Sequence, residues 1–191
     1  MTDPSGPRPH EQHGGSVEAH SGPSEREVTA DRKRQVAVIG TGGATPESES
    51  WWLAEEVGRR LAQAGAVVVC GGRGGVMAAV SRGAARVGGE VIGIVPGNDP
   101  ADANPDCTHV VATGVGHARN LAVVGSGEVV IAIGGEWGTL SEIGHARTLG
   151  RTVVALRSWT LAGRDRMEGA PGVITVETAE KAVAVALAAL E

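Results

Sequence analysis

The sequence predicts a single α/β domain of the doubly wound type, in which helices cover both faces of a parallel sheet. Three observations indicate this fold class. Short apolar runs rich in valine and isoleucine alternate with segments of helical spacing from residue 35 onward. The runs are unbroken, as expected for strands that are buried on both faces. The chain has four tryptophans and no phenylalanine or tyrosine, so its core must consist of small aliphatic side chains, the usual filling of such a sheet.

Residues 1–34 differ in composition from the rest of the chain. They are rich in proline, glycine, serine, histidine and glutamate and contain few apolar residues, so they cannot bury enough surface to fold. We therefore expect a disordered tail followed by one domain over residues 35–191, a length that suits a single core. The tail contains His10, His13 and His20 but no structure that would bring them together, and we predict no metal site.

Seven apolar runs predict the strands of the sheet. Most are rich in β-branched residues and end at glycine, proline or polar residues. The predicted strands are residues 35–40, 66–70, 90–95, 108–111, 129–133, 152–156 and 172–176. Because helical segments separate most of these runs, the connections are βαβ crossovers and the strands run parallel. This is a Rossmann-like arrangement, in which ligands bind at the carboxyl ends of the strands.

In most of the segments between the predicted strands, apolar residues recur at the spacing of a helix. After the first strand, Thr45 is predicted as an N-cap because Pro46 suits the first helical position, and this helix ends near Gly65. The other predicted helices are residues 76–87, a segment that carries Arg119 and ends near residues 125–127, a segment that begins at Thr139, and residues 178–190. The last helix is apolar nearly all round, which indicates packing on the sheet and on another subunit. We therefore expect a homodimer or a larger homo-oligomer.

Composition excludes several classes of partner. The formal net charge is −5 and aromatic residues are too few to stack bases, so we expect no binding to nucleic acid. No apolar stretch is long enough to span a membrane, and the N-terminus lacks the pattern of a signal peptide. Of the two cysteines, Cys107 has no close cysteine neighbour and Cys70 lies within an apolar run, where a buried thiol is expected. These features predict a soluble cytoplasmic protein without membrane partners.

Three glycine-rich turns follow predicted strands, at residues 40–45, 71–75 and 134–139. Each turn leads into a helix whose first N–H groups can bind an oxyanion, at the ligand-binding edge of the sheet. The turns therefore predict a site for a phosphorylated small molecule. The residues expected to contact it are Gly42, Gly43, Gly72, Arg73, Gly74, Gly75, Gly134, Gly135, Gly138 and Thr139. A dehydrogenase is disfavoured, because Gly71 and Gly72 follow the second strand where an acidic residue would bind the ribose of NAD.

The third turn and two further segments resemble one protein family. Gly134–Glu142 (GGEWGTLSE) resembles the Pro-Gly-Gly-x-Gly-Thr-x-x-Glu signature of the Lonely Guy (LOG) family, whose members have been labelled lysine decarboxylase-like. Gly71–Met77 (GGRGGVM) is similar to the family's turn after the second strand. Gly116–Asn120 (GHARN) is similar to the segment that carries its functional arginine. Together these segments extend the resemblance over most of residues 35–155.

The LOG resemblance implies Arg119 and Glu142 as a catalytic pair. LOG enzymes hydrolyse the N-glycosidic bond of nucleoside 5′-monophosphates, of the AMP or cytokinin riboside monophosphate type, to a free base and ribose 5-phosphate, and no cofactor is implied. A carboxylate can stabilise the oxocarbenium-like sugar and orient water, and an arginine can hold the substrate. A structural role for Glu142 is also open, because Thr139 and Glu142 have the spacing of a capping box.

The pair Arg119-Asn120, together with residues 138–143 (GTLSEI), looks closer to another branch of the same superfamily, that of the molybdenum-cofactor carrier-like proteins, than to the LOG enzymes. Ile133 stands where the LOG enzymes have proline, and Asn120 follows Arg119 where they usually have lysine. On this interpretation the protein binds a nucleotide or a phosphorylated cofactor, such as the molybdenum cofactor, and Trp137 is the better placed tryptophan for stacking on it. Binding is therefore the first expectation, and phosphoribohydrolase activity is the alternative.

Overall fold

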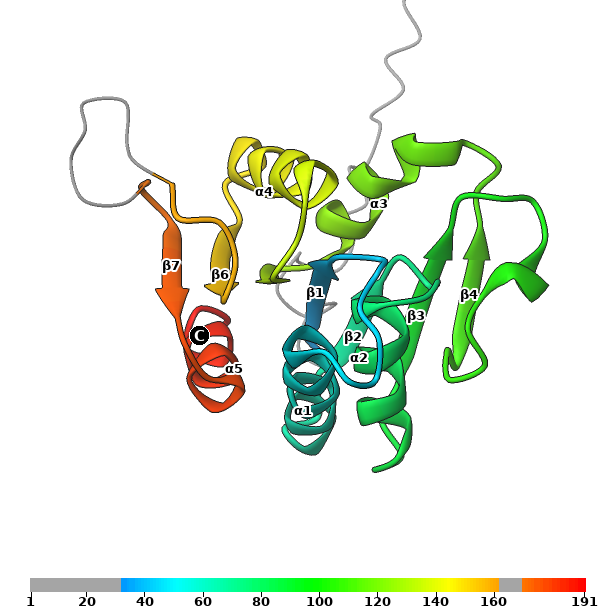
Figure 1. Cartoon of the computed structure of the whole chain (residues 1–191), viewed down its shortest axis with the longest axis horizontal. Helices are drawn as coiled ribbons and strands as arrows, with labels where there is room; N and C mark the ends of the chain where they lie inside the picture. Colours follow the sequence, from blue (N-terminus) through cyan, green and yellow to red (C-terminus); the bar gives the residue numbers. More distant parts are fainter. Residues whose placement is uncertain (1–31, 162–169) are drawn as a thin grey trace, which may run out of the picture. The chain divides into compact units, whose positions relative to one another are not determined.

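Seven parallel strands form the sheet of this protein, in the order β4-β3-β2-β1-β5-β6-β7 (Figure 1). The computed structural model describes residues 32–161 and 170–191, and every neighbouring pair of strands in them is parallel. The predicted Rossmann-like α/β fold is confirmed. The predicted tail over residues 1–34, with its three histidines, lies outside the described residues except for residues 32–34.

The strands begin and end within one residue of the predicted bounds. They are Gln35–Gly40 (β1), Val67–Cys70 (β2), Val91–Val95 (β3), His109–Ala112 (β4), Val129–Ile133 (β5), Thr152–Leu156 (β6) and Val173–Val176 (β7). The helices are Glu49–Gln63 (α1), Val76–Ala85 (α2), Arg119–Ser126 (α3), Trp137–Thr148 (α4) and Ala179–Ala188 (α5), with short 3₁₀ turns at Pro100–Asp102 (η1) and Gly116–Ala118 (η2). The strands agree closely because apolar runs and the residues that end them are local signals.

Helices cover both faces of the sheet. α1, α2 and α5 pack on one face, and α3 and α4 pack on the other (Figure 1). Side chains of β1 alternate between the two cores, because successive residues of a strand point to opposite faces. Val36 and Val38 pack with the first group of helices, whereas Ala37 and Ile39 pack with the second. All four are buried, as the unbroken apolar run predicts.

Two glycines allow α1 and α2 to touch through their backbones. Gly58 of α1 lies against the carbonyl oxygen of Val80, and Gly83 of α2 lies against the carbonyl oxygen of Glu55. A Cβ atom at either glycine would lie closer than 3.0 Å to that oxygen. The two helices therefore approach each other at positions where no larger side chain fits.

The order of the strands reverses at β1. β2, β3 and β4 extend the sheet on one side of β1, and β5, β6 and β7 extend it on the other. The helix that follows β1 packs on one face of the sheet, whereas the helix that follows β5 packs on the opposite face (Figure 1). The carboxyl ends of β1 and β5 thus mark a topological switch point, where doubly wound sheets bind their ligands.

The first helix begins later than predicted. Ser48, not Thr45, is the N-cap of α1, and its Oγ accepts a hydrogen bond from the backbone N–H of Trp51 at 3.3 Å. Thr45 instead forms a turn with Ser48, whose backbone N–H donates to the Thr45 carbonyl oxygen at 2.8 Å. Both residue types can cap a helix, and the turn around Pro46 places the second of them at the helix start.

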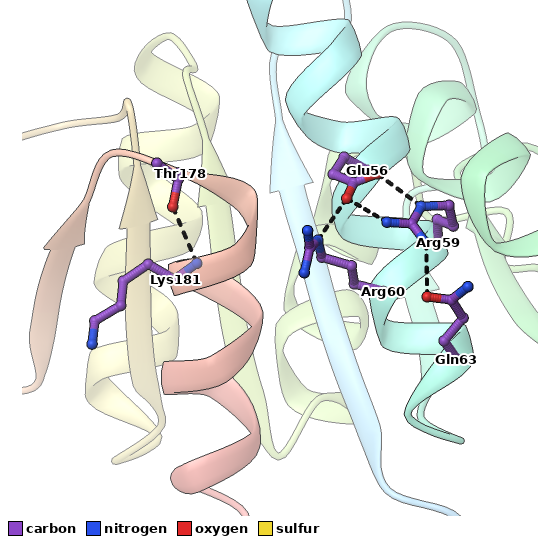
Figure 2. Close-up of polar contacts among 6 residues, drawn as sticks. All are labelled: Glu56, Arg59, Arg60, Gln63, Thr178 and Lys181. Atoms are coloured by element: carbon purple, nitrogen blue, oxygen red, sulfur yellow. Dashed lines mark hydrogen bonds and ion pairs between the residues drawn. The ribbon is translucent and has the colours of Figure 1, made fainter.

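Polar contacts stabilise the exposed sides of α1 and α5 (Figure 2). The carboxylate of Glu56 accepts hydrogen bonds from Arg59 at 2.8 Å and from Arg60 at 2.6 Å. The bond from Arg59 is the main reason why the pKa of Glu56 is lowered to about 2. At the start of α5, the hydroxyl of Thr178 accepts a hydrogen bond from the backbone N–H of Lys181 at 3.2 Å. This N-cap starts the last helix where the sequence predicts it.

Within residues 32–161 and 170–191, no helix combines the length and apolarity that a membrane crossing requires. In the same two ranges, histidine, cysteine, aspartate and glutamate side chains form no group of three or more that could hold a metal ion.

Candidate functional site

A cavity of about 190 Å³ lies at the topological switch point. Its walls come from the end of β1 and the turn after it, from Gly71 after β2, from the start of α3 and from the first turns of α4. These segments are far apart in the sequence. They meet because β2, β1 and β5 are neighbours in the sheet and present their carboxyl ends at one edge.

Arg119 supplies a positive charge to this cavity. Its guanidinium lies against Gly71, where a Cβ atom would be closer than 3.0 Å to both Nη1 and Nη2, and Nη2 lies 3.9 Å from Sδ of Met77. The Nε atom of Arg119 is buried and has no hydrogen-bond partner among the described residues. An unpaired buried donor costs about 1–3 kcal/mol, more when it is charged. The Arg119 side chain is therefore placed to bind an acceptor that the described part of the chain does not provide.

Glu142 faces the same cavity from α4 and is only 7% exposed. Burial raises the pKa of Glu142 to about 7, although the positive charge of Arg119 acts in the opposite direction. Burial also lowers the pKa of Arg119, and the charge of Glu142 opposes that shift. No hydrogen bond to another described residue contributes to the shift of Glu142. A carboxyl group with this pKa can release or accept a proton near neutral pH.

The capping-box role considered for Glu142 is wrong. α4 begins at Trp137 with Glu136 as its N-cap, so Thr139 lies inside the helix and does not open it. The helix starts early because the two glycines before Glu136 adopt positive φ angles of 55° and 109°, which complete the turn after β5 within two residues. As a consequence, Thr139 and Glu142 lie one helical turn apart along the wall of the cavity.

The structure brings together five of the residues predicted for the site. The residues that line the cavity as predicted are Gly42, Arg119, Gly138, Thr139 and Glu142. The cavity is also lined by residues that were not among the predicted contacts, namely Val38, Ile39, Gly40, Thr41, Gly71, Met77, His117, Asn120 and Glu136. Most of these lie inside or beside the motifs from which the LOG resemblance was drawn, and that position was the available signal.

The first two turns pack against each other. The backbone N–H of Val76 donates to the carbonyl oxygen of Thr41 at 3.0 Å. Gly75 adopts a φ of 65° and passes so close to Thr41 and Gly42 that a Cβ atom would overlap both. Gly43 and Gly75 both lie outside the cavity wall. Gly75 is therefore required by the contact between the turns and does not line the cavity.

The predicted contacts of the second turn also lie outside the cavity wall, namely Gly72, Arg73 and Gly74. The backbone N–H of Asn104 donates to the Gly72 carbonyl oxygen at 2.7 Å, and the Asn104 amide donates to the Arg73 carbonyl oxygen at 3.1 Å. These bonds hold the turn against the loop that follows β3. The charge of Arg73 is nevertheless close enough to lower the pKa of Arg119, so it adds to the positive potential around the cavity.

Two free thiols, one buried and one partly buried, lie beside this turn. Cys70, fully buried as predicted, lies 3.5 Å from the hydroxyl of Ser81, and that hydroxyl lies 3.8 Å from the thiol of Cys107. Both cysteines are free. The group packs under the second turn and does not reach the cavity wall.

The glycines of the third turn line two different hollows. Gly138 lines the cavity, whereas Gly134 and Gly135 line a separate hollow of about 430 Å³ together with Ser158 and Trp159. The hydroxyl of Ser158 donates a hydrogen bond to the Gly134 carbonyl oxygen. The two glycines therefore connect the turn to the segment after β6, and they do not line the cavity.

The chain matches one protein-family model over most of its length. The model of the SLOG cluster4 family matches residues 33–183, which is most of the chain and all of the sheet. The chain belongs to the SLOG cluster4 family. The resemblance to the LOG family that the three motifs indicate is confirmed.

One curated protein is similar to this chain in sequence, and several solved structures are similar to it in fold. An uncharacterized protein of Archaeoglobus fulgidus is 40% identical over 128 residues, which are 64% of this chain and 80% of that protein. A solved structure of a molybdenum cofactor binding protein from Rippkaea orientalis is 30% identical with a TM-score of 0.75, and the match covers 85% of this chain and 100% of that one. The molybdenum cofactor carrier protein of Chlamydomonas reinhardtii is 26% identical with a TM-score of 0.71, covering 83% and 99% of the two chains.

The cavity of this SLOG cluster4 member has the features of an anion site. The first turn of α4 has no side-chain cap, so its backbone N–H groups are available to donate to an oxyanion beside Gly138 and Thr139. Arg119 provides charge-assisted donors to the same cavity. Glu142, which also lines it, can be neutral or ionised near pH 7. The arrangement suits a ligand that carries a phosphate.

Proposed function

We propose that this protein binds a nucleotide or another phosphorylated cofactor, of the molybdenum-cofactor class, in the cavity at the switch point. The observation that carries the proposal is the buried Nε of Arg119, which has no partner among the described residues. A phosphate oxygen is a natural acceptor for a guanidinium. The uncapped start of α4 supplies further donors to the same space.

The relatives support the chemical class of the ligand. Two solved structures with this fold are of proteins named for binding or carrying the molybdenum cofactor, and the matches cover nearly the whole length of each. The molybdenum cofactor and the nucleotides share two parts, a phosphate and a planar heterocycle. In this proposal Arg119 and the uncapped first turn of α4 hold the phosphate.

A second candidate function is phosphoribohydrolase activity with Arg119 and Glu142. The specific observation in its favour is the burial of Glu142, which raises the pKa of its carboxyl group to about 7. Such a group can move a proton at neutral pH and can stabilise positive charge on a ribose ring. In this candidate the bond between the base and C1′ breaks, water adds to C1′, and the base leaves with a proton.

Binding of AMP, N6-modified AMP and a pterin phosphate by calorimetry tests the proposal, combined with an assay for free base. We expect uptake of at least one of these probes without release of base. Arg119→Ala should weaken that binding by about 10- to 100-fold, because charge-assisted hydrogen bonds are lost. Arg82→Ala removes a similar charge from the outer face of α2 and should leave the affinity unchanged.

The Glu142→Gln variant separates the two functions. If the protein is a binding protein, the variant should still take up the probe. If wild-type protein releases base and Glu142→Gln abolishes the release while the probe still binds, the hydrolase is correct. Failure of the wild-type protein to bind any probe contradicts both.

We also propose that the protein is a homo-oligomer. The last helix keeps apolar side chains at the surface, since Ala184 and Ala188 are exposed one turn apart and Val185 and Leu187 are only partly buried. Exposed apolar patches commonly mark contacts between subunits. Light scattering after size exclusion should therefore give a multiple of the 19.3 kDa chain mass, and a clean monomer mass would contradict this.

A further inference from the structure

A pair of tryptophans, one exposed and one partly buried against the core, lies beside the cavity. Trp137, the first residue of α4, is 77% exposed, and its ring centroid lies 5.3 Å from that of Trp159 with an angle of 42° between the planes. The indole N–H of Trp159 donates to the carbonyl oxygen of Glu136 at 3.3 Å. This bond ties Trp159 to the turn that bears Trp137, so the segment after β6 and the start of α4 present one aromatic surface.

The pair stands at the rim of the phosphate site. Glu136 and Gly138, the residues on either side of Trp137, both line the cavity that contains Arg119 and Glu142. Trp159 lines the neighbouring hollow of about 430 Å³. The aromatic surface therefore adjoins both spaces at the same edge of the sheet.

The size of the cavity shows why a ligand must extend beyond it. Sites for cofactor-sized ligands occupy roughly 300–1,000 Å³, whereas this cavity measures about 190 Å³. This volume suits a phosphate and part of a sugar or a side arm. The remainder of the ligand must lie across the rim.

We infer that Trp137 and Trp159 form a stacking surface for the planar heterocycle of a phosphorylated ligand whose phosphate occupies the cavity. The inference rests on the proposed function and adds the second point of recognition. Two observations at the cavity itself point to a ligand, namely the unpartnered Arg119 Nε and the Glu142 carboxyl group, which is more than nine-tenths buried. A tryptophan left in water at this rim gains contact area when a flat ring covers it.

The test compares two probes, AMP and ribose 5-phosphate, in wild-type protein and Trp137→Ala by calorimetry. Stacking of a base on an aromatic side chain is worth enough for a loss of about tenfold in AMP affinity. Ribose 5-phosphate has no aromatic ring that could stack, so its affinity should stay the same in the variant. Trp137→Phe keeps an aromatic face and should retain most of the AMP affinity.

Trp52→Ala is the matched control, because Trp52 is also exposed but lies on α1, and its neighbours in the chain line neither of the two spaces, whereas both neighbours of Trp137 line the cavity. It should bind both probes as wild-type protein does, and circular dichroism shows whether each variant is folded. Equal AMP affinity of wild-type protein and Trp137→Ala overturns the stacking surface but leaves the phosphate site intact. If the wild-type protein binds ribose 5-phosphate but not AMP, the stacking surface is likewise overturned and the phosphate site is left intact. Wild-type protein that binds neither of these probes, nor N6-modified AMP, nor the pterin phosphate, overturns the proposed function as well.

Discussion

Gly83→Ala is expected to lower the free energy of unfolding by about 3 kcal/mol, the upper part of the range for overpacked sites. A Cβ atom at this position would lie closer than 3.0 Å to the carbonyl oxygen of Glu55 in α1. The obstacle is backbone and cannot rotate away, so α1 and α2 must move apart and weaken the core between them and the sheet. In a domain of this size the melting temperature should fall by about 6–12 °C.

Gly144→Ala is the matched control for this substitution. Gly144 is also inside a helix, but nothing lies within 4 Å of a Cβ atom built there. Alanine favours helix over glycine, so this variant should be more stable by about 0.5–1 kcal/mol. Urea denaturation of both variants gives the comparison. Equal stabilities would show that α1 and α2 do not approach at Gly83 as described.

The second large effect is a gain of stability in Glu142→Gln that depends on pH. The pKa of Glu142 is raised from 4.5 to about 7 in the folded protein. Below pH 4.5 the group is protonated in both the folded and the unfolded chain and costs nothing. As the pH rises toward 7, the unfolded chain ionises first, so the wild-type protein loses stability. The full loss above pH 7 is roughly 3 kcal/mol, since one pKa unit corresponds to about 1.4 kcal/mol.

Glutamine does not ionise and therefore avoids this loss. The stability of the variant relative to wild-type protein should be near zero at pH 4 and should rise to roughly 3 kcal/mol by pH 8. Urea denaturation at a series of pH values measures this difference, in which the other titrating groups cancel. A difference that stays constant between pH 4 and pH 8 would contradict the burial of an ionisable carboxyl group at this position.

Glu56→Gln provides a control of opposite sign. The pKa of Glu56 is lowered to about 2, mainly by the hydrogen bond from Arg59 (Figure 2). Its contribution is present above pH 4.5 and is lost as the pH falls toward 2. Glu56→Gln should therefore be less stable than wild-type protein at pH 7, and the difference should shrink in acid. The effect should be smaller than at Glu142, because Glu56 is more than a third exposed and solvent screens its charge.

The fold could be predicted to a large extent, but the site only in part. The strands were predictable because each is a local apolar run, and Arg119 and Glu142 were predictable because they lie in recognisable motifs. The sequence alone did not indicate which glycines of the three turns line the cavity and which are needed only for the shape of the turns. Gly42 and Gly138 line the cavity, whereas Gly75 is required by the contact of one turn with another, and that contact is not encoded within either turn.

The amino-acid sequence by itself determined the parallel sheet, the positions of the glycine-rich turns and the family, since these depend on residues close together in the chain. Tertiary structure decided which turns share a cavity, because that depends on the order of the strands and the switch point beside β1. It also decided that the guanidinium of Arg119 lies over Gly71 and that Trp137 meets Trp159. The direction of a side chain and its distant neighbours follow from packing, which local spacing does not specify.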